Sequence, residues 1–179
     1  MKKIIIYSLT ILTLSISSCA RKTYFNTEVR NRVTANNIPL TKLQYYVDRD
    51  VELRRVLSSS ETKVSSGAIV TENGKQVHII SLKKGTPGVC TQVATDRISV
   101  AFEEGNNKNL VFAFPKGGTS KNAYMLAPLS LDKNNFGTIS YNGTNYYVMP
   151  DGVRAKLKVK RSSDTKVKIK KSTMKGRKV

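Results

Sequence analysis

Apolar and polar residues alternate with a period of two along most of the chain after residue 28. β-Branched and aromatic residues are frequent in these stretches, and breaks rich in glycine, asparagine or proline separate them, which is typical of strands joined by turns. The clearest turns are Asn73-Gly74 and Asn142-Gly143, because both residue types tolerate the positive φ of a tight hairpin. About ten short strands and no convincing helix predict an all-β domain, a small antiparallel barrel or sandwich.

Residues 40–57 fit two different structures. Alternation at Leu43, Tyr45 and Val47, a turn at residues 48–50 and a second strand from Val51 predict a hairpin, which is the structure that we expect. The alternative is one amphipathic helix, whose apolar stripe would consist of Leu40, Leu43, Val47, Val51 and Leu57.

The start of the chain has the layout of an export signal. Lys2 and Lys3 precede an apolar run at residues 4–16. At about 1.5 Å per residue this run makes about 20 Å of helix, too short for a hydrocarbon core of about 30 Å. Residues 16–19, Ile-Ser-Ser-Cys, resemble the bacterial lipobox, and the resemblance implies removal of residues 1–18 and lipidation of Cys19. An ordinary signal peptide with an incidental cysteine is the alternative.

These boundaries predict four segments. The 161 residues that remain after removal of residues 1–18 are the size of one domain. The segments are a signal peptide (1–18), a lipidated cysteine with a tether (19–27), a single β domain that ends in a basic hairpin (28–171) and a basic disordered tail (172–179).

The charge of the chain favours anionic partners. Without Lys2 and Lys3, 29 Lys and Arg stand against 12 Asp and Glu, a net charge of +17. The envelope offers anionic phospholipid headgroups, lipopolysaccharide phosphates, peptidoglycan and acidic proteins, whereas the compartment disfavours nucleic acid.

The residues after Cys19 indicate where the anchor lies. The whole chain resembles the small uncharacterised β-rich lipoproteins of Bacteroidetes, and this resemblance implies a location but no activity. Lipoproteins of that group destined for the cell surface carry acidic residues after the cysteine, whereas Ala20, Arg21 and Lys22 follow it here. Ala20 also differs from the aspartate that retains enterobacterial lipoproteins at the inner membrane. We therefore expect a periplasm-facing lipoprotein of the outer membrane.

A glycine turn gives one further resemblance. Residues 85–89, Gly-Thr-Pro-Gly-Val, are followed by a β-prone stretch at residues 98–102. Together they resemble the glycine turn and following strands of SH3-like barrels, which implies an SH3-like part of the domain.

The C-terminal segment is the candidate binding site. Cations alternate with apolar residues on both sides of a turn at residues 162–165, which predicts a hairpin with one buried face and one cationic face. Like charges on one face repel, so a bound polyanion would stabilise it. The alternative is that these lysines only prevent aggregation at a sheet edge. The seven cations are Arg154, Lys156, Lys158, Lys160, Lys166, Lys168 and Lys170.

The sequence also contains two adjacent tyrosine pairs, Tyr45-Tyr46 and Tyr146-Tyr147, and two single residues of interest. One tyrosine of each pair should point outward, so Tyr46 or Tyr147 could stack on sugars or peptides, whereas a place in the core is the commoner outcome. We expect His78 to be an outward-facing polar residue of a strand. Cys90, the one cysteine left beside Cys19, should be a buried, unreactive thiol.

Catalytic and cofactor signatures are absent from the sequence. Residues 132–143 begin like a calcium loop but end in Gly143, where a glutamate is needed, so we expect no metal site and no cofactor. We predict a protein that is not an enzyme and that binds or scaffolds peptidoglycan or an acidic envelope protein. The alternatives are an enzyme that acts on cell-wall or lipid substrates, with acids such as Glu103 or Asp96, and a structural subunit of an envelope complex.

Overall fold

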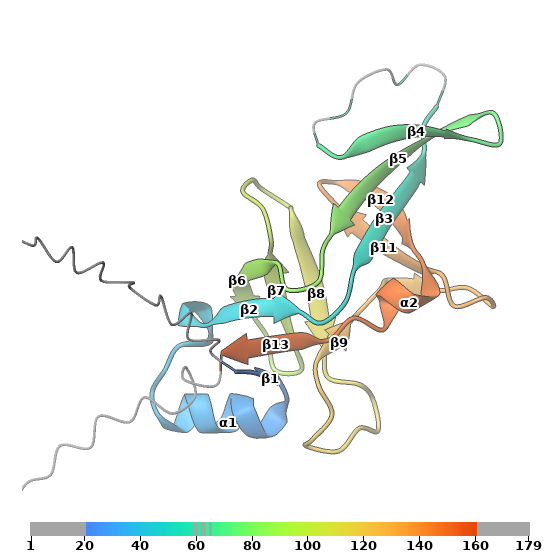
Figure 1. The fold of residues 1–179 in the computed structure, drawn as a ribbon. Coiled ribbons are helices and arrows are strands. Elements are labelled where there is room, and N and C mark those ends of the chain that lie inside the picture. Colours follow the sequence, from blue (N-terminus) through green and yellow to red (C-terminus); the bar gives the residue numbers. More distant parts are fainter. Residues whose placement is uncertain (1–20, 59–60, 62–63, 65, 161–179) are drawn as a thin grey trace, which may run out of the picture.

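Two antiparallel sheets make up most of the protein (Figure 1). The computed structural model describes residues 21–58, 61, 64 and 66–160. Thirteen strands in these residues form the two sheets, and two short helices and one 3₁₀ turn accompany them. The all-β prediction is confirmed, in a sandwich-like form. No helix of the described part is long and apolar enough to cross a membrane.

The first sheet has seven strands in the order β1-β13-β2-β6-β7-β8-β9. Its strands are β1 (Lys22–Tyr24), β2 (Gln44–Val47), β6 (Pro87–Val93), β7 (Arg97–Ala101), β8 (Asn109–Ala113), β9 (Met125–Leu126) and β13 (Leu157–Lys160). An isolated bridge also pairs Met125 of β9 with Lys156, directly before β13. The sheet therefore brings together the first and the last strands of the described chain.

The second sheet has six strands in the order β10-β11-β12-β3-β5-β4. Its strands are β3 (Val51–Val56), β4 (Ala68–Glu72), β5 (Lys75–Leu82), β10 (Ser130–Leu131), β11 (Gly137–Tyr141) and β12 (Thr144–Val148). Both predicted Asn-Gly hairpins are confirmed, because Asn73-Gly74 has φ of 49° and 72° and Asn142-Gly143 has φ of 51° and 73°. A one-turn helix, α2 (Pro150–Val153), leads from β12 to β13.

Residues 40–57 contain the two expected strands, but these strands do not pair. β2 lies between β13 and β6 in the first sheet, and β3 lies between β12 and β5 in the second. The chain passes from one sheet to the other at residues 48–50. The predicted hairpin is therefore wrong, because period-two alternation identifies a strand and its buried face but not its partner. The alternative helix is wrong as well, apart from a 3₁₀ turn at Leu40–Lys42.

Helix α1 (Thr27–Ala35) was not expected from the pattern. The side chain of its N-cap residue, Asn26, accepts the N–H of Val29 at 2.9 Å, a usual way to start a helix. Val29 and Val33 are its buried residues. An apolar stripe of two residues in nine is too short to give a helical period, so the helix was missed.

The segment predicted as a tether belongs to the fold from Lys22 onward. β1 pairs with β13, and Phe25 is fully buried. The ring centroid of Phe25 lies 5.3 Å from that of Tyr45 and 4.9 Å from that of Tyr124. The prediction of a tether over residues 19–27 is corrected accordingly, because a short polar segment around one aromatic residue can still add an edge strand and a core ring.

One core unites both sheets and α1. Tyr45 lies in its centre and donates its hydroxyl proton to the carbonyl oxygen of Leu40 at 3.0 Å. Burial raises the pKa of Tyr45 well above its usual value. The hydroxyl therefore stays neutral and acts as a structural donor.

Candidate anion-binding site

Strand β13 carries the alternating basic pattern inside the first sheet. Leu157 and Val159 are fully buried, as is Ala155 just before the strand, whereas the lysines between them project to the outer face. The strand lies between β1 and β2, so the cations of one side of the predicted hairpin sit in the interior of a sheet.

The neighbouring strands add two tyrosines and a fourth lysine to this outer face. Lys22 of β1 lies opposite Lys160, and Lys158 lies between Tyr24 of β1 and Tyr46 of β2. Residues that are directly opposed in antiparallel strands project from the same face of the sheet. We call this set the lysine face: Lys22, Tyr24, Tyr46, Lys156, Lys158 and Lys160.

Three of the four lysines lie over aromatic rings. The Nζ atom of Lys22 is 3.7 Å from the ring centroid of Tyr46. The Nζ atoms of Lys158 and Lys156 are 4.6 Å and 5.8 Å from the ring centroid of Tyr24. Ring faces attract cations without neutralising them, so these contacts hold the ammonium groups in place and leave their charge available.

The lysines of the lysine face differ from the arginines of β3 in their lack of ion pairs. Arg54 of β3 pairs with glutamates at 3.2 Å, and Arg55 pairs with Glu61 at 2.8 Å. Within the described residues, none of the four lysines of the lysine face forms an ion pair with a carboxylate. The four lysines of the lysine face therefore remain able to attract an outside anion.

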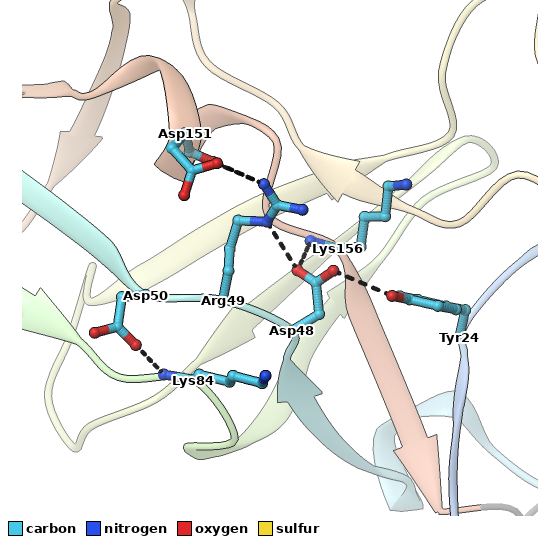
Figure 2. A network of polar contacts seen from close by, with 7 residues as sticks. All are labelled: Tyr24, Asp48, Arg49, Asp50, Lys84, Asp151 and Lys156. Atoms are coloured by element: carbon cyan, nitrogen blue, oxygen red, sulfur yellow. Dashed lines mark hydrogen bonds and ion pairs between the residues drawn. The ribbon is translucent and has the colours of Figure 1, made fainter.

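Asp48 links the strands that carry the lysine face, as Figure 2 shows. Its carboxylate accepts the backbone N–H of Lys156 at 2.7 Å, the hydroxyl of Tyr24 at 3.4 Å and the Nε–H of Arg49 at 3.4 Å. Only 6% of its side chain is exposed. Arg49 in turn reaches Asp151 of α2 at 2.7 Å. The acid therefore fixes β1, β13 and the turn after β2 relative to one another rather than quenching a lysine ammonium group.

β13 is one side of the predicted C-terminal hairpin, and the other side lies outside the described residues. Over Lys158 and Val159 both edges of β13 are occupied, by β1 and by β2. Of the seven predicted cations, Lys156, Lys158 and Lys160 belong to the lysine face, and Arg154 is exposed directly after α2. Lys166, Lys168, Lys170 and the proposed lipid attachment residue Cys19 lie outside the described residues.

Sequence reasoning missed three residues of this region. Lys22 and Tyr24 were assigned to the tether, although they alternate with Thr23 and the buried Phe25, which is a short strand pattern. Asp48 was assigned to a turn, and its burial depends on β1 and β13, which lie far from it in sequence.

The two candidate stacking tyrosines, Tyr46 and Tyr147, differ in exposure. Tyr46 is 8% exposed and lies under Lys22, so its prediction as an open stacking platform is wrong. Tyr147 of β12 is 59% exposed. It lines a shallow groove of about 390 Å³ together with Arg54 and Met149. A stacking role for Tyr147 therefore stays a prediction.

His78 is buried, contrary to expectation, because both ring nitrogens are satisfied. Only 3% of the residue is exposed. Its Nδ1 accepts the hydroxyl proton of Tyr146 at 3.1 Å, and its Nε2–H donates to the carbonyl oxygen of Ser66. Cys90 is buried as predicted, and burial raises the pKa of its thiol. Neither residue is presented to a substrate.

The acids considered for an enzyme do not meet. Asp96 lies just before β7 and pairs with Arg97 at 3.0 Å, whereas Glu103 lies after the other end of this strand. Glu103 accepts the hydroxyl of Tyr141 and pairs with Lys108 at 3.4 Å, beside a cleft of about 160 Å³. The described residues contain no group of three or more metal-ligating side chains.

Comparison of the chain with protein-family models, with curated proteins and with solved structures finds no match. The resemblance to SH3-like barrels therefore stays a prediction.

Proposed function

We propose that the chain is a lipid-anchored protein of the bacterial cell envelope that binds or scaffolds an anionic envelope component. The observation that carries this proposal is the lysine face, on which four ammonium groups share one surface without a carboxylate partner in the described part. The segment after Lys160 adds eight Lys and Arg against the single acid Asp164. A polyanion bound there would relieve the repulsion among these charges.

The anchor in this proposal is an acyl group on Cys19, with the domain facing the periplasm from the outer membrane. Growth with labelled palmitate should label the chain and place it in the membrane fraction. The variant Cys19→Ser should lose both the label and the membrane association. Label in that variant, or no label in either chain, would contradict the anchor.

Binding to the predicted partners can be tested by co-sedimentation with peptidoglycan sacculi and by cross-linking to acidic envelope proteins. The probe is the chain from residue 19 with Cys19→Ser, because it keeps every described residue. Reversal of charge at Lys156, Lys158 and Lys160 should abolish salt-sensitive binding, and the same change at the exposed residues Lys75, Lys116 and Lys133 should not. Equal binding by both variants would refute the role of the lysine face.

A second candidate function, that of a structural subunit of an envelope complex, is favoured by one observation. Leu129 and Leu131 are 71% and 55% exposed, and Leu131 belongs to β10, the outermost strand of the second sheet. A sheet edge with exposed apolar residues can pair with another chain. Leu131→Lys should then abolish a cross-link that the parent chain forms in the envelope.

A further inference from the structure

We infer that the lysine face lies against the anionic headgroups of the membrane that carries the anchor. The inference rests on the proposed lipid anchor and deepens the proposed function, since it names anionic phospholipid as the partner. Three properties of the molecule lead to it: the place where both chain ends leave the first sheet, the composition of the lysine face and the pairing of the arginines in the second sheet.

The two ends of the described chain meet at one corner of the first sheet. Lys22, the first residue of β1, lies opposite Lys160, the last residue of β13. Cys19 precedes Lys22 by three residues, which span at most about 10 Å. The screening length at physiological salt is about 8 Å. An acyl group on Cys19 therefore holds this corner of the lysine face within about one screening length of the membrane surface.

The basic C-terminal segment leaves the sheet at the same corner. It begins with Arg161, directly after Lys160, and holds eight of the Lys and Arg residues of the chain. A cluster of basic residues beside a lipid anchor adds electrostatic attraction to anionic headgroups.

The composition of the lysine face suits a headgroup layer. Tyr24 is 42% exposed, and Tyr46 lies beneath Lys22. Tyrosine rings with lysine side chains over them combine an apolar body with charged tips, which matches the boundary between headgroups and acyl chains.

The two arginines of β3 on the far side of the molecule are paired with carboxylates. The hairpin of β4 and β5 lies at the opposite end from β1 and β13 (Figure 1). On this second sheet Arg54 and Arg55 are paired with glutamates. A wall polymer, which lies at a distance from the membrane, would meet this end first. The lysine face gathers four lysines, unpaired within the described residues, on one surface beside the proposed anchor, which favours the membrane over the wall as their partner.

The test uses the chain from residue 19 with Cys19→Ser and measures its partition onto vesicles of phosphatidylcholine, with and without phosphatidylglycerol. One variant changes Lys22, Lys158 and Lys160 to glutamine. The matched control changes Lys75, Lys116 and Lys133, which are exposed elsewhere, so both variants lose the same charge. Each lysine near an anionic surface changes the partition about fivefold, so the first variant should bind roughly a hundredfold more weakly.

We expect salt-sensitive binding to the anionic vesicles alone, a large loss in the first variant and little loss in the control. Binding to sacculi without binding to vesicles would overturn the inference and leave the proposed function standing. Binding to neither vesicles nor sacculi, together with no cross-link to an acidic envelope protein, would overturn both. Equal losses in the two variants would show that net charge rather than the lysine face is responsible, which also overturns the inference. If thermal unfolding shows that the triple variant is not folded, Lys160→Gln alone should still lose about fivefold.

Discussion

The burial of Asp48 gives the sharpest test of how the lysine face is held. Asp48 and Asp50 lie two residues apart, and each accepts a backbone N–H at 2.7 Å, from Lys156 and Lys84 respectively. The side chain of Asp48 is 6% exposed, whereas that of Asp50 is 53% exposed. The two acids therefore make the same backbone contact but differ in access to water and in their side-chain partners, which are Tyr24 and Arg49 for Asp48 and Lys83 for Asp50.

The loss in the free energy of unfolding depends on whether water can replace the missing carboxylate. In Asp48→Ala the N–H of Lys156 loses its acceptor in a largely closed site, and such an unsatisfied group costs about 1–3 kcal/mol. The contacts with Tyr24 and Arg49 are lost too, so we expect a loss of about 2–3 kcal/mol in the free energy of unfolding. Asp48→Asn keeps one acceptor oxygen and should lose about half as much. In Asp50→Ala water can take the place of the carboxylate, so the loss should be clearly smaller.

Urea unfolding at neutral pH measures these differences, with an unchanged slope as evidence that the same structure unfolds. A second readout is the exposure of Tyr24, whose fluorescence or chemical modification should change in Asp48→Ala and not in Asp50→Ala. Equal losses for the two alanine variants would refute the argument that burial makes Asp48 the support of the lysine face.

Three further predictions concern the rest of the fold. Gly88→Ala should lower the free energy of unfolding by about 1–3 kcal/mol, because its Cβ would lie 2.7 Å from the ring of Phe102; an unchanged urea midpoint would contradict this. Hydrogen bonds, that from Arg55 foremost, lower the pKa of Glu61, so its stabilising effect is present above the unfolded value of about 4.3 and is lost on acidification; Glu61→Gln should flatten the acid side of the stability curve. The thiol of Cys90 should resist alkylation until urea unfolds the chain, and rapid labelling of the folded protein would count against its burial.

Local patterns allowed much of the fold to be predicted. The alternation of Ala155, Leu157 and Val159 with lysines correctly indicated which side of β13 is buried. The Asn-Gly pairs correctly indicated two hairpins, because the residues themselves favour positive φ. These signals are local and need no knowledge of the partner strand.

The remainder depends on contacts between distant residues. The pairing of β13 with β1 and β2 joins residues more than one hundred positions apart, so the sequence pattern could not show that Lys22 and Tyr24 share a face with Lys158. His78 reads as an outward residue because it is polar. It is buried because Tyr146, from β12, satisfies its ring. The hydrophobic period and the composition of a segment do not identify its distant partners.

The interior position of β13 also decides how the lysine face can be tested. Removing every residue after Gly152 would delete a strand that pairs on both sides and three fully buried residues, Ala155, Leu157 and Val159. Truncating one large buried side chain already costs about 2–5 kcal/mol, and a whole domain is stable by only about 5–15 kcal/mol. The truncated chain should therefore unfold, and its failure to bind would say nothing about charge. Only substitutions on the outer face, which leave the buried side of β13 intact, can separate binding from folding.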